Sequence, residues 1–357
     1  MTSTTAAPPR QQWQFGRIYS PDEAWLATAE PEPVIEPELP MIDTHHHLWL
    51  RGGHRYLLDE LLADLDTGHH NVVATVFEEC HSHYRAEGPV EMRPVGESEF
   101  VAGIAAMSAS GNYGKTRVAA GIVGAADLTL GERVEPVLLA QMRAAGGRFR
   151  GVRHSAGYDA DPIIGNSGSG MQPGLYRRPD FRAGLARLGA LGLSFDAWLY
   201  HPQLGDVIDL ARAFPATPIV MCHVGGFLGY GPYGGKRDEE FARWKRSITE
   251  LAECPNVVVK LGGMINRGAA YDFHAAGPPP SSATIAAAWR PFVETCIGLF
   301  GANRCMFESN FPVDKMGVGY AALGNAFKRI TSGASADEKR AVFSGTAKRV
   351  YRLGEIG

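Results

Sequence analysis

The sequence has few cysteines and no long apolar run. Its 357 residues include five widely spaced cysteines with no Cys-x-x-Cys pair: Cys80, Cys222, Cys254, Cys296 and Cys305. An odd, scattered set does not build a disulfide framework and is typical of reduced thiols in the cytoplasm. No apolar stretch approaches the roughly 18 residues of a membrane-spanning helix, and residues 1–12 lack the apolar core of a signal peptide. We therefore expect a cytoplasmic protein without a membrane partner.

Neither sign of charge dominates the chain. Lysine and arginine total 35 and aspartate and glutamate total 38, which gives a net charge of −3. A nearly neutral chain with interspersed signs gives no electrostatic reason to expect a nucleic-acid partner. Hydrophobic residues make up 45% and charged residues 20%, so the chain can bury a substantial core and is neither disordered nor a coiled coil. We expect a small-molecule substrate as its partner, and a homo-oligomer stays open.

The chain is too long for one small domain. At about 150 residues per domain, its length suggests either two domains or one large α/β barrel. Eight short apolar, β-branched runs are predicted as strands: 40–44, 71–77, 117–123, 149–153, 193–199, 217–222, 256–261 and 304–307. The segments between and after them have apolar residues at helical spacing: 56–65, 100–108, 134–145, 181–191, 204–214, 239–252, 285–300 and 336–353. Eight strand–helix units predict an α/β fold, a (β/α)8 TIM barrel.

A doubly wound open sheet is the alternative architecture. No Gly-x-Gly-x-x-Gly follows the first predicted strand, which weakens the dinucleotide-binding form of that alternative. Prolines interrupt the segment before this strand and exclude a helix or a central strand there: Pro31, Pro33, Pro37 and Pro40. We predict an extended N-terminal arm over residues 1–40, followed by a single barrel domain over residues 41–357.

Histidines occur at several predicted strand ends, where TIM barrels carry their chemistry. His45 and His47 follow the first strand, and a period of two places both side chains on the same face, where they can share one metal ion. Imidazole nitrogen suits zinc and similar divalent ions. His201 and His223 follow later strands and are further candidates. The alternatives are a histidine-rich turn, a strand cap at His201 and a satisfied core group at His223.

Charged residues also lie at the predicted strand ends. Arg153 and Lys260 are candidates to hold an anionic group of the substrate, and the alternative is an ion pair with Glu79 or Glu308. Glu79 and Tyr200, which end the second and fifth strands, are further candidates for substrate binding. Asp43 is a candidate either to accept a proton from a neighbouring imidazole or to cap the following turn.

Several motifs together resemble one protein family. They are Asp43-Thr44-His45-His46-His47-Leu48-Trp49, Gly151-Val152-Arg153, His201-Pro202-Gln203-Leu204, His223-Val224-Gly225-Gly226, Val259-Lys260-Leu261-Gly262-Gly263 and residues 347–353. In this order they resemble the amidohydrolase superfamily, specifically its amidohydrolase-2 branch of metal-dependent barrels. That branch includes lactonases and non-oxidative decarboxylases. The resemblance implies His45 and His47 as metal ligands, with His201 and His223 completing the site or touching the substrate.

The eighth strand departs from the family pattern. The family commonly has Ser-Asp-Trp-Pro there, whose aspartate binds the metal and acts as the base, whereas this chain has Ser309-Asn310-Phe311-Pro312. An amide can bind through its oxygen but cannot accept a proton. Glu308 is the first candidate to replace the aspartate, followed by Glu79 and Asp314. The alternative is that Glu308 forms an ion pair with Lys260 or Arg153 and that Asn310 only caps the strand.

The sequence therefore predicts a metal-dependent hydrolase that opens a lactone or related cyclic ester of a small, anionic substrate. Glu308, Asn310 and His223 are the catalytic candidates. Zinc is the first choice of ion, with manganese or another first-row divalent ion as alternatives, and metal-independent activity stays open because not every lactonase of this kind requires a metal. The rival functions are a decarboxylase, or another lyase or isomerase, on the same metal site, and a catalytically silent barrel that binds a ligand.

Overall fold

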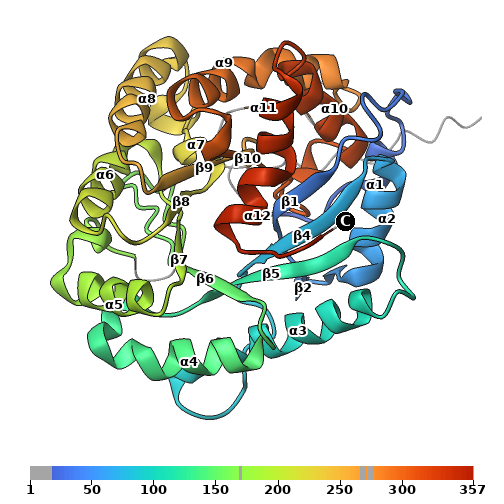
Figure 1. Cartoon of the computed structure of the whole chain (residues 1–357). Coiled ribbons are helices and arrows are strands. Elements are labelled where there is room, and N and C mark those ends of the chain that lie inside the picture. The colour runs from blue at the N-terminus through green and yellow to red at the C-terminus, as the bar shows by residue number, and fades with distance from the viewer. Residues whose placement is uncertain (1–17, 169–170, 266–270, 272, 274–276, 357) are drawn as a thin grey trace, which may run out of the picture.

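The structure is a computed structural model that describes residues 18–168, 171–265, 271, 273 and 277–356 (Figure 1). Eight parallel strands form one sheet in the order β1-β4-β5-β6-β7-β8-β9-β10. Their bounds are β1 (Met41–His46), β4 (Val72–Glu78), β5 (Arg117–Ala125), β6 (Phe149–Arg153), β7 (Ser194–Ala197), β8 (Ile219–Met221), β9 (Val257–Leu261) and β10 (Cys305–Phe307). A parallel bridge between His46 and Phe311 joins the first strand to the segment after the last. The (β/α)8 barrel is thus confirmed, and each predicted strand overlaps an observed one.

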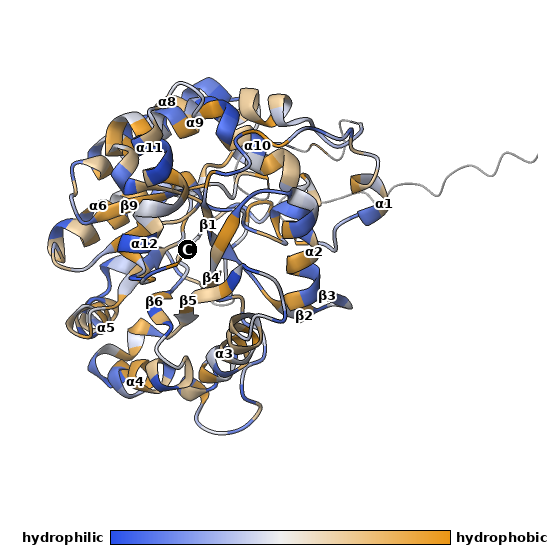
Figure 2. Ribbon diagram, turned by 45° about the vertical axis from the view of Figure 1, so that its right-hand side comes forward, coloured by the Kyte–Doolittle hydropathy of each residue, from blue (hydrophilic) through white to orange (hydrophobic). Residues whose placement is uncertain are grey.

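Helices surround the sheet (Figures 1 and 2). The longer ones are α2 (Leu58–Gly68), α3 (Val95–Ala109), α4 (Glu135–Ala144), α5 (Pro179–Ala190), α6 (Leu204–Ala213), α8 (Arg237–Ala252), α9 (Ser282–Phe300) and α10 (Tyr320–Ile330). The sequence did not predict α10, which contains a glycine that weakens its helical propensity. That glycine, Gly324, is required by packing, because a Cβ there would lie 2.2 Å from Nε2 of His70.

The C-terminal segment closes the end of the barrel at which the strands begin. The single helix predicted over 336–353 is divided into α11 (Ala336–Arg340), a π-helical turn over Ala341–Gly345, and α12 (Thr346–Val350). Figure 1 shows α12 lying across the ring of strands. Ala347, Tyr351 and Leu353 share a core cluster with inward residues of the barrel strands. The opposite end, where the strands finish, stays open for a site.

Two short elements lie outside the regular strand–helix units, one before β1 and one after it. The arm contains a one-turn helix, α1 (Glu23–Leu26), and Pro33 and Ile35 exchange backbone hydrogen bonds with the side chain of Asn325 on α10. The described part of the predicted arm, residues 18–40, therefore lies along the barrel surface. A hairpin of β2 (Trp49–Arg51) and β3 (His54–Tyr56) follows β1 and was not predicted.

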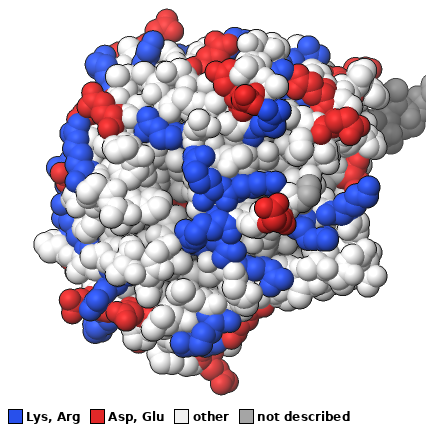
Figure 3. Space-filling view, in the orientation of Figure 1, with Lys and Arg blue, Asp and Glu red and all other residues white. Residues whose placement is uncertain are grey.

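Charges of both signs are spread over the face in Figure 3, with basic side chains gathered near its centre.

None of the helices in the described part of the chain combines the length and apolarity needed to cross a membrane.

The packing of α2 against α10 predicts a dependence of stability on pH. His70 is buried there; its Nε2 donates to the carbonyl of Ala321 and its Nδ1 accepts from Lys328. Burial, followed by the charge of Lys328, lowers the pKa of His70 to about 4, so the folded protein binds this proton less well than the unfolded chain. The stabilisation is present above about pH 6.5 and is lost as the pH falls toward 4.

We expect the contribution of His70 to the unfolding free energy to fall by up to about 3 kcal/mol across this range. Urea unfolding of the wild type and His70→Gln at several pH values measures it. The variant should show the shallower decline, and equal slopes in the two proteins would contradict the assignment.

Candidate active site

Period-two alternation builds a polar layer above an apolar one inside the barrel. The lower, apolar layer comes from four inward strand residues: Val76, Val220, Val258 and Met306. Two positions further along each strand, the same face carries Glu78, Cys222, Lys260 and Glu308. Residues i and i+2 of a strand share a face, so the barrel changes from apolar to ionisable within one step. The polar layer is fully buried.

An irregularity in β1 determines the direction of His45. The register between β1 and β4 shifts between Asp43 and His46, where the first strand contains one extra residue. Ile42 points into the barrel core, so strict alternation would turn His45 outward. A bulge with one extra residue reverses that alternation. His45 consequently reaches the interior beside Glu308.

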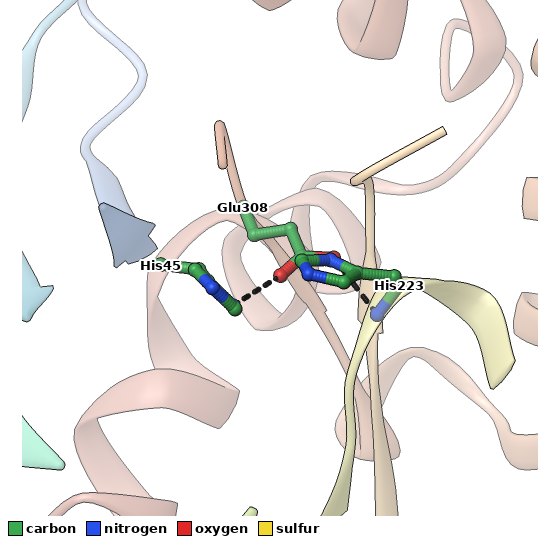
Figure 4. A group of neighbouring side chains, drawn as sticks. All are labelled: His45, His223 and Glu308. Atoms are coloured by element: carbon green, nitrogen blue, oxygen red, sulfur yellow. Dashed lines mark hydrogen bonds and ion pairs between the residues drawn. The ribbon is translucent and has the colours of Figure 1, made fainter. Parts of the chain in front are cut away.

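Glu308 stands between two imidazoles (Figure 4). Its Oε2 lies 2.9 Å from Nδ1 of His45, and its Oε1 lies 2.9 Å from Nδ1 of His223. Oε1 also accepts the backbone N–H of His223 at 3.1 Å. Three residues from β1, from the segment after β8 and from the end of β10 therefore bring ligand atoms within 4.8 Å of one another. His45 and His223, two of the metal ligands that the sequence predicted, therefore lie side by side, and Glu308 adds a carboxylate to the same group.

This group fits a divalent cation. Nδ1 of His45 and Oε2 of Glu308 are buried and have no hydrogen-bond partner, because their contact lacks hydrogen-bond geometry. Burial, followed by the nearby charge of Lys260, holds the pKa of His45 well below its usual value, so the ring is neutral as a metal ligand must be. Imidazole and carboxylate donors in a buried cluster suit zinc and similar ions.

His47 lies beside this group, with its ring centroid 4.9 Å from that of His45. Its Nδ1 is 2.8 Å from the carbonyl oxygen of Glu78. A carbonyl only accepts, so Nδ1 carries the hydrogen and Nε2 keeps its lone pair. His47 can therefore serve as a further ligand or contact the substrate.

The chain after β9 passes close to the group. A Cβ on Gly263 would lie 1.9 Å from Nδ1 of His223, and a Cβ on Gly262 would lie 2.5 Å from Cγ of Glu308. Gly263 also has a φ of +63°, which side chains disfavour. Two consecutive glycines therefore leave room for the two functional side chains. Gly226 is also closely packed, since a Cβ there would lie 1.9 Å from the carbonyl oxygen of Leu199.

We expect Gly263→Ala to displace His223 and to lower kcat/KM by at least about tenfold, since a misplacement of about 1 Å of an active group is costly. Steady-state kinetics and thermal unfolding of the same preparation separate misplacement from unfolding. Gly298→Ala is a matched control, because a Cβ there meets no atom within 4 Å. Unchanged kinetics in Gly263→Ala would show that the backbone can move away from His223.

Arg153 borders the group and pairs with Glu79. Its Nε donates to Oε1 of Glu79 at 2.7 Å, and its Nη1 lies 3.2 Å from Nε2 of His45. Burial alone would raise the pKa of Glu79. The charge of the Arg153 guanidinium has the larger effect, and the pKa of Glu79 lies below its usual value. The ion pair that the sequence left as an alternative for Arg153 and Glu79 is therefore present, and both residues line the pocket.

Lys260 lies below the pocket rather than on its wall. Its Nζ is 2.8 Å from Oε2 of Glu78 and 3.0 Å from Oδ2 of Asp196, and all three side chains are fully buried. Burial alone would lower the pKa of Lys260, but these carboxylates outweigh it and raise the pKa well above the usual value. The predicted partners, Glu79 and Glu308, are thus replaced by Glu78 and Asp196. The Lys260 cation also occupies the second cluster of possible metal ligands, which Glu78 and Asp196 form with Cys222.

The structure places His201 and Tyr200 apart from the group. Nδ1 of His201 accepts from the backbone N–H of Leu228, and its Nε2 lies 2.9 Å from Glu240. With both nitrogens engaged, His201 has no free lone pair for a metal. Tyr200 is fully buried in a cluster with Ile164 and Leu228, and it does not belong to the pocket wall.

Asn310 lines the pocket and has a φ of +56°. Its backbone N–H donates to the carbonyl of His45, and its Nδ2 donates to Oδ1 of Asp314 at 2.8 Å. Burial raises the pKa of Asp314 well above its usual value, which favours the neutral acid. The carboxylate of Asp43 accepts hydrogen bonds from the backbone N–H of Ser309 and from the hydroxyl of Tyr320. Asp43 therefore links β1 to the segment that follows β10.

The pocket above the group has a volume of about 160 Å³. Its wall also includes several side chains that were not among the predicted site residues: Trp49, Arg51, His81, Ser155, Ser167 and Trp198. Trp198 packs edge to face against His223, with centroids 4.7 Å apart. Since Trp198 directly follows β7, its place at a strand end was the signal that could have identified it.

Comparison with known proteins extends over nearly the whole chain. A family model described as amidohydrolase matches residues 42–353, from β1 to just beyond α12. The uncharacterized protein y4mH of Sinorhizobium fredii is 31% identical over 335 residues, covering 90% of this chain and 98% of that protein. L-fucono-1,5-lactonase of Burkholderia multivorans is 29% identical over 246 residues, covering 68% of this chain and 74% of the lactonase. A solved amidohydrolase structure from Burkholderia multivorans with bound zinc has a TM-score of 0.66 and 25% identity, over 88% of this chain and 99% of that chain.

Proposed function

This chain belongs to the amidohydrolase family and is a hydrolase, and from this premise we propose that it opens a small lactone or related cyclic ester. The observation that carries the proposal is the buried carboxylate of Glu308 between the imidazoles of His45 and His223. Ester hydrolysis needs an electrophile at the carbonyl and a base for water, and this group can supply both. A relative named as an L-fucono-1,5-lactonase supports a cyclic ester as the substrate class.

His45, His223 and Glu308 would hold a divalent ion, with His47 beside them. Zinc is our first choice, because the donors suit it and a related barrel binds it. When bound, such an ion polarises a carbonyl and lowers the pKa of water. Glu308 takes the proton of the attacking water, a role that the neutral amide of Asn310 cannot fill. Asn310 orients the substrate through its place on the pocket wall.

The remaining wall residues select and position a small substrate. A volume of about 160 Å³ is below the roughly 300–1,000 Å³ of pockets for drug-sized ligands. Trp198 supplies an apolar edge beside His223, and Ser155 and Ser167 supply hydroxyl groups. A compact ring with several hydroxyl or carboxyl groups fits this mixture.

Elemental analysis of protein purified without added metal, followed by assay on a panel of lactones in ¹⁸O-labelled water, tests the proposal. We expect about one bound divalent ion per chain and one labelled oxygen in the hydroxy-acid product. Release of CO₂ from an acid without incorporation of label would instead identify a decarboxylase on the same site. Bound ligand with no turnover on the panel would identify a silent binding barrel.

A further inference from the structure

The charges around the pocket are not all compensated. Arg153 pairs with Glu79, and Lys260 is buried below the wall between Glu78 and Asp196. These two cations, which the sequence suggested for an anionic substrate, are therefore already neutralised. Arg51 also lines the pocket, and within the described residues no carboxylate lies in ion-pair contact with it. Its charge is the one that remains for a ligand.

The β2–β3 hairpin holds Arg51 at the pocket. Gly52 and Gly53, with φ values of +55° and +84°, form its two-residue turn, a geometry that residues with side chains rarely adopt. Trp49 and Arg51 are two positions apart on β2, and both line the pocket; Trp49 is buried, and Arg51 is open to solvent at the pocket mouth. The alternation of the strand thus directs this arginine toward the site.

Two further contacts fix the guanidinium. It lies over the ring of Trp49, with 4.8 Å from Cζ to the ring centroid, and its Nη2 donates to the carbonyl of Cys80. Trp49 in turn stacks on His47 and donates to Nδ1 of His54. A guanidinium has five N–H donors, so these contacts leave others available in a fixed direction. A positioned, uncompensated arginine at the wall of a small pocket is suited to a carboxylate.

We propose that Arg51 binds a carboxylate that the substrate carries away from its scissile ester. The substrate class is then a lactone with a free carboxylate, such as an aldaric-acid lactone, rather than a neutral sugar lactone. The inference rests on the proposed function, because it names the substrate of the same site. His81 does not supply the charge, since its Nε2 lies 3.5 Å from Oε2 of Glu79.

A matched pair of substrates tests the proposal: D-glucaro-1,4-lactone, which carries a carboxylate, and D-glucono-1,4-lactone, which does not. We expect Arg51→Gln to raise KM for the carboxylated lactone at least about tenfold, with kcat within about twofold, and to leave the neutral lactone unchanged. Arg51→Lys should retain part of the preference, because it keeps the charge but loses the planar fork. Arg55→Gln on the same hairpin is the control, since Arg55 pairs with Asp59 and Glu60 away from the pocket. Equal effects of Arg51→Gln on both lactones, or none on either, would overturn the proposal.

Calorimetric binding of D-glucarate separates this inference from the proposed function. If no lactone is hydrolysed, the proposed function fails, and binding alone decides the role of Arg51. Binding by the wild type that weakens at least about tenfold in Arg51→Gln supports the carboxylate site. Equal binding by both proteins, or none by the wild type at millimolar concentration, overturns it.

Discussion

Glu308→Gln is expected to lower kcat/KM by at least about 10³-fold, because it removes the charge at the centre of the site. Glutamine has nearly the same shape, but it cannot accept a proton, and one of its two terminal groups is an NH₂ donor. That donor would face Nδ1 of His45 or of His223, where an anionic oxygen now stands. We also expect the variant to retain less than about a tenth of the metal of the wild type, since loss of one ligand lowers affinity steeply.

Metal content and steady-state kinetics on the same preparation measure both effects. Asp314→Asn is the matched control, because burial favours the neutral form of this acid and asparagine resembles that form closely. We expect the control to stay within about tenfold of the wild type. A fully active Glu308→Gln with an inactive Asp314→Asn would transfer the role of base to Asp314, the other candidate on the same segment.

The polar layer of the barrel could be predicted because strand ends follow simple rules. Apolar runs of four to seven residues located every strand, and the residues that end or follow these runs gave His45, Arg153, His223 and Glu308. The extra residue in β1 could not be predicted, since nothing in Asp43-Thr44-His45-His46 marks which position bulges. The sequence therefore identified the right histidines through a regular alternation that the strand does not follow.

The sequence predicted which residues belong to the polar layer better than it predicted which of them form ion pairs with one another. Lys260 pairs with Glu78 and Asp196, whereas the sequence offered Glu79 and Glu308 as partners. Which carboxylate meets a cation depends on barrel stagger, and a single strand does not encode it. Arg51 was missed for a related reason, since its hairpin lies outside the strand–helix repeat. His201 follows its strand as predicted but turns into a 3₁₀ helix (His201–Gln203) that directs it to Glu240.

Lys260→Met is expected to lower the free energy of unfolding by about 3–5 kcal/mol. Lys260 is the cation between two fully buried carboxylates, and methionine fills its volume without its charge. Asp196 would then be left buried with only the hydrogen bond that Tyr351 donates to it, and Glu78 with only Arg153, whose Nε lies 3.5 Å from Oε1 of Glu78. Urea unfolding should show a lower midpoint with an unchanged slope, which reports stability rather than a change in compactness.

A double variant distinguishes charge from packing. Lys260→Met combined with Glu78→Gln removes one of the stranded charges, and we expect it to recover about half of the loss. Because Lys260 lies outside the pocket wall, the folded single variant should still hydrolyse substrate at temperatures below its transition. A loss below about 1 kcal/mol would mean that the carboxylates take up protons at little expense, and the barrel would then not depend on this ion pair.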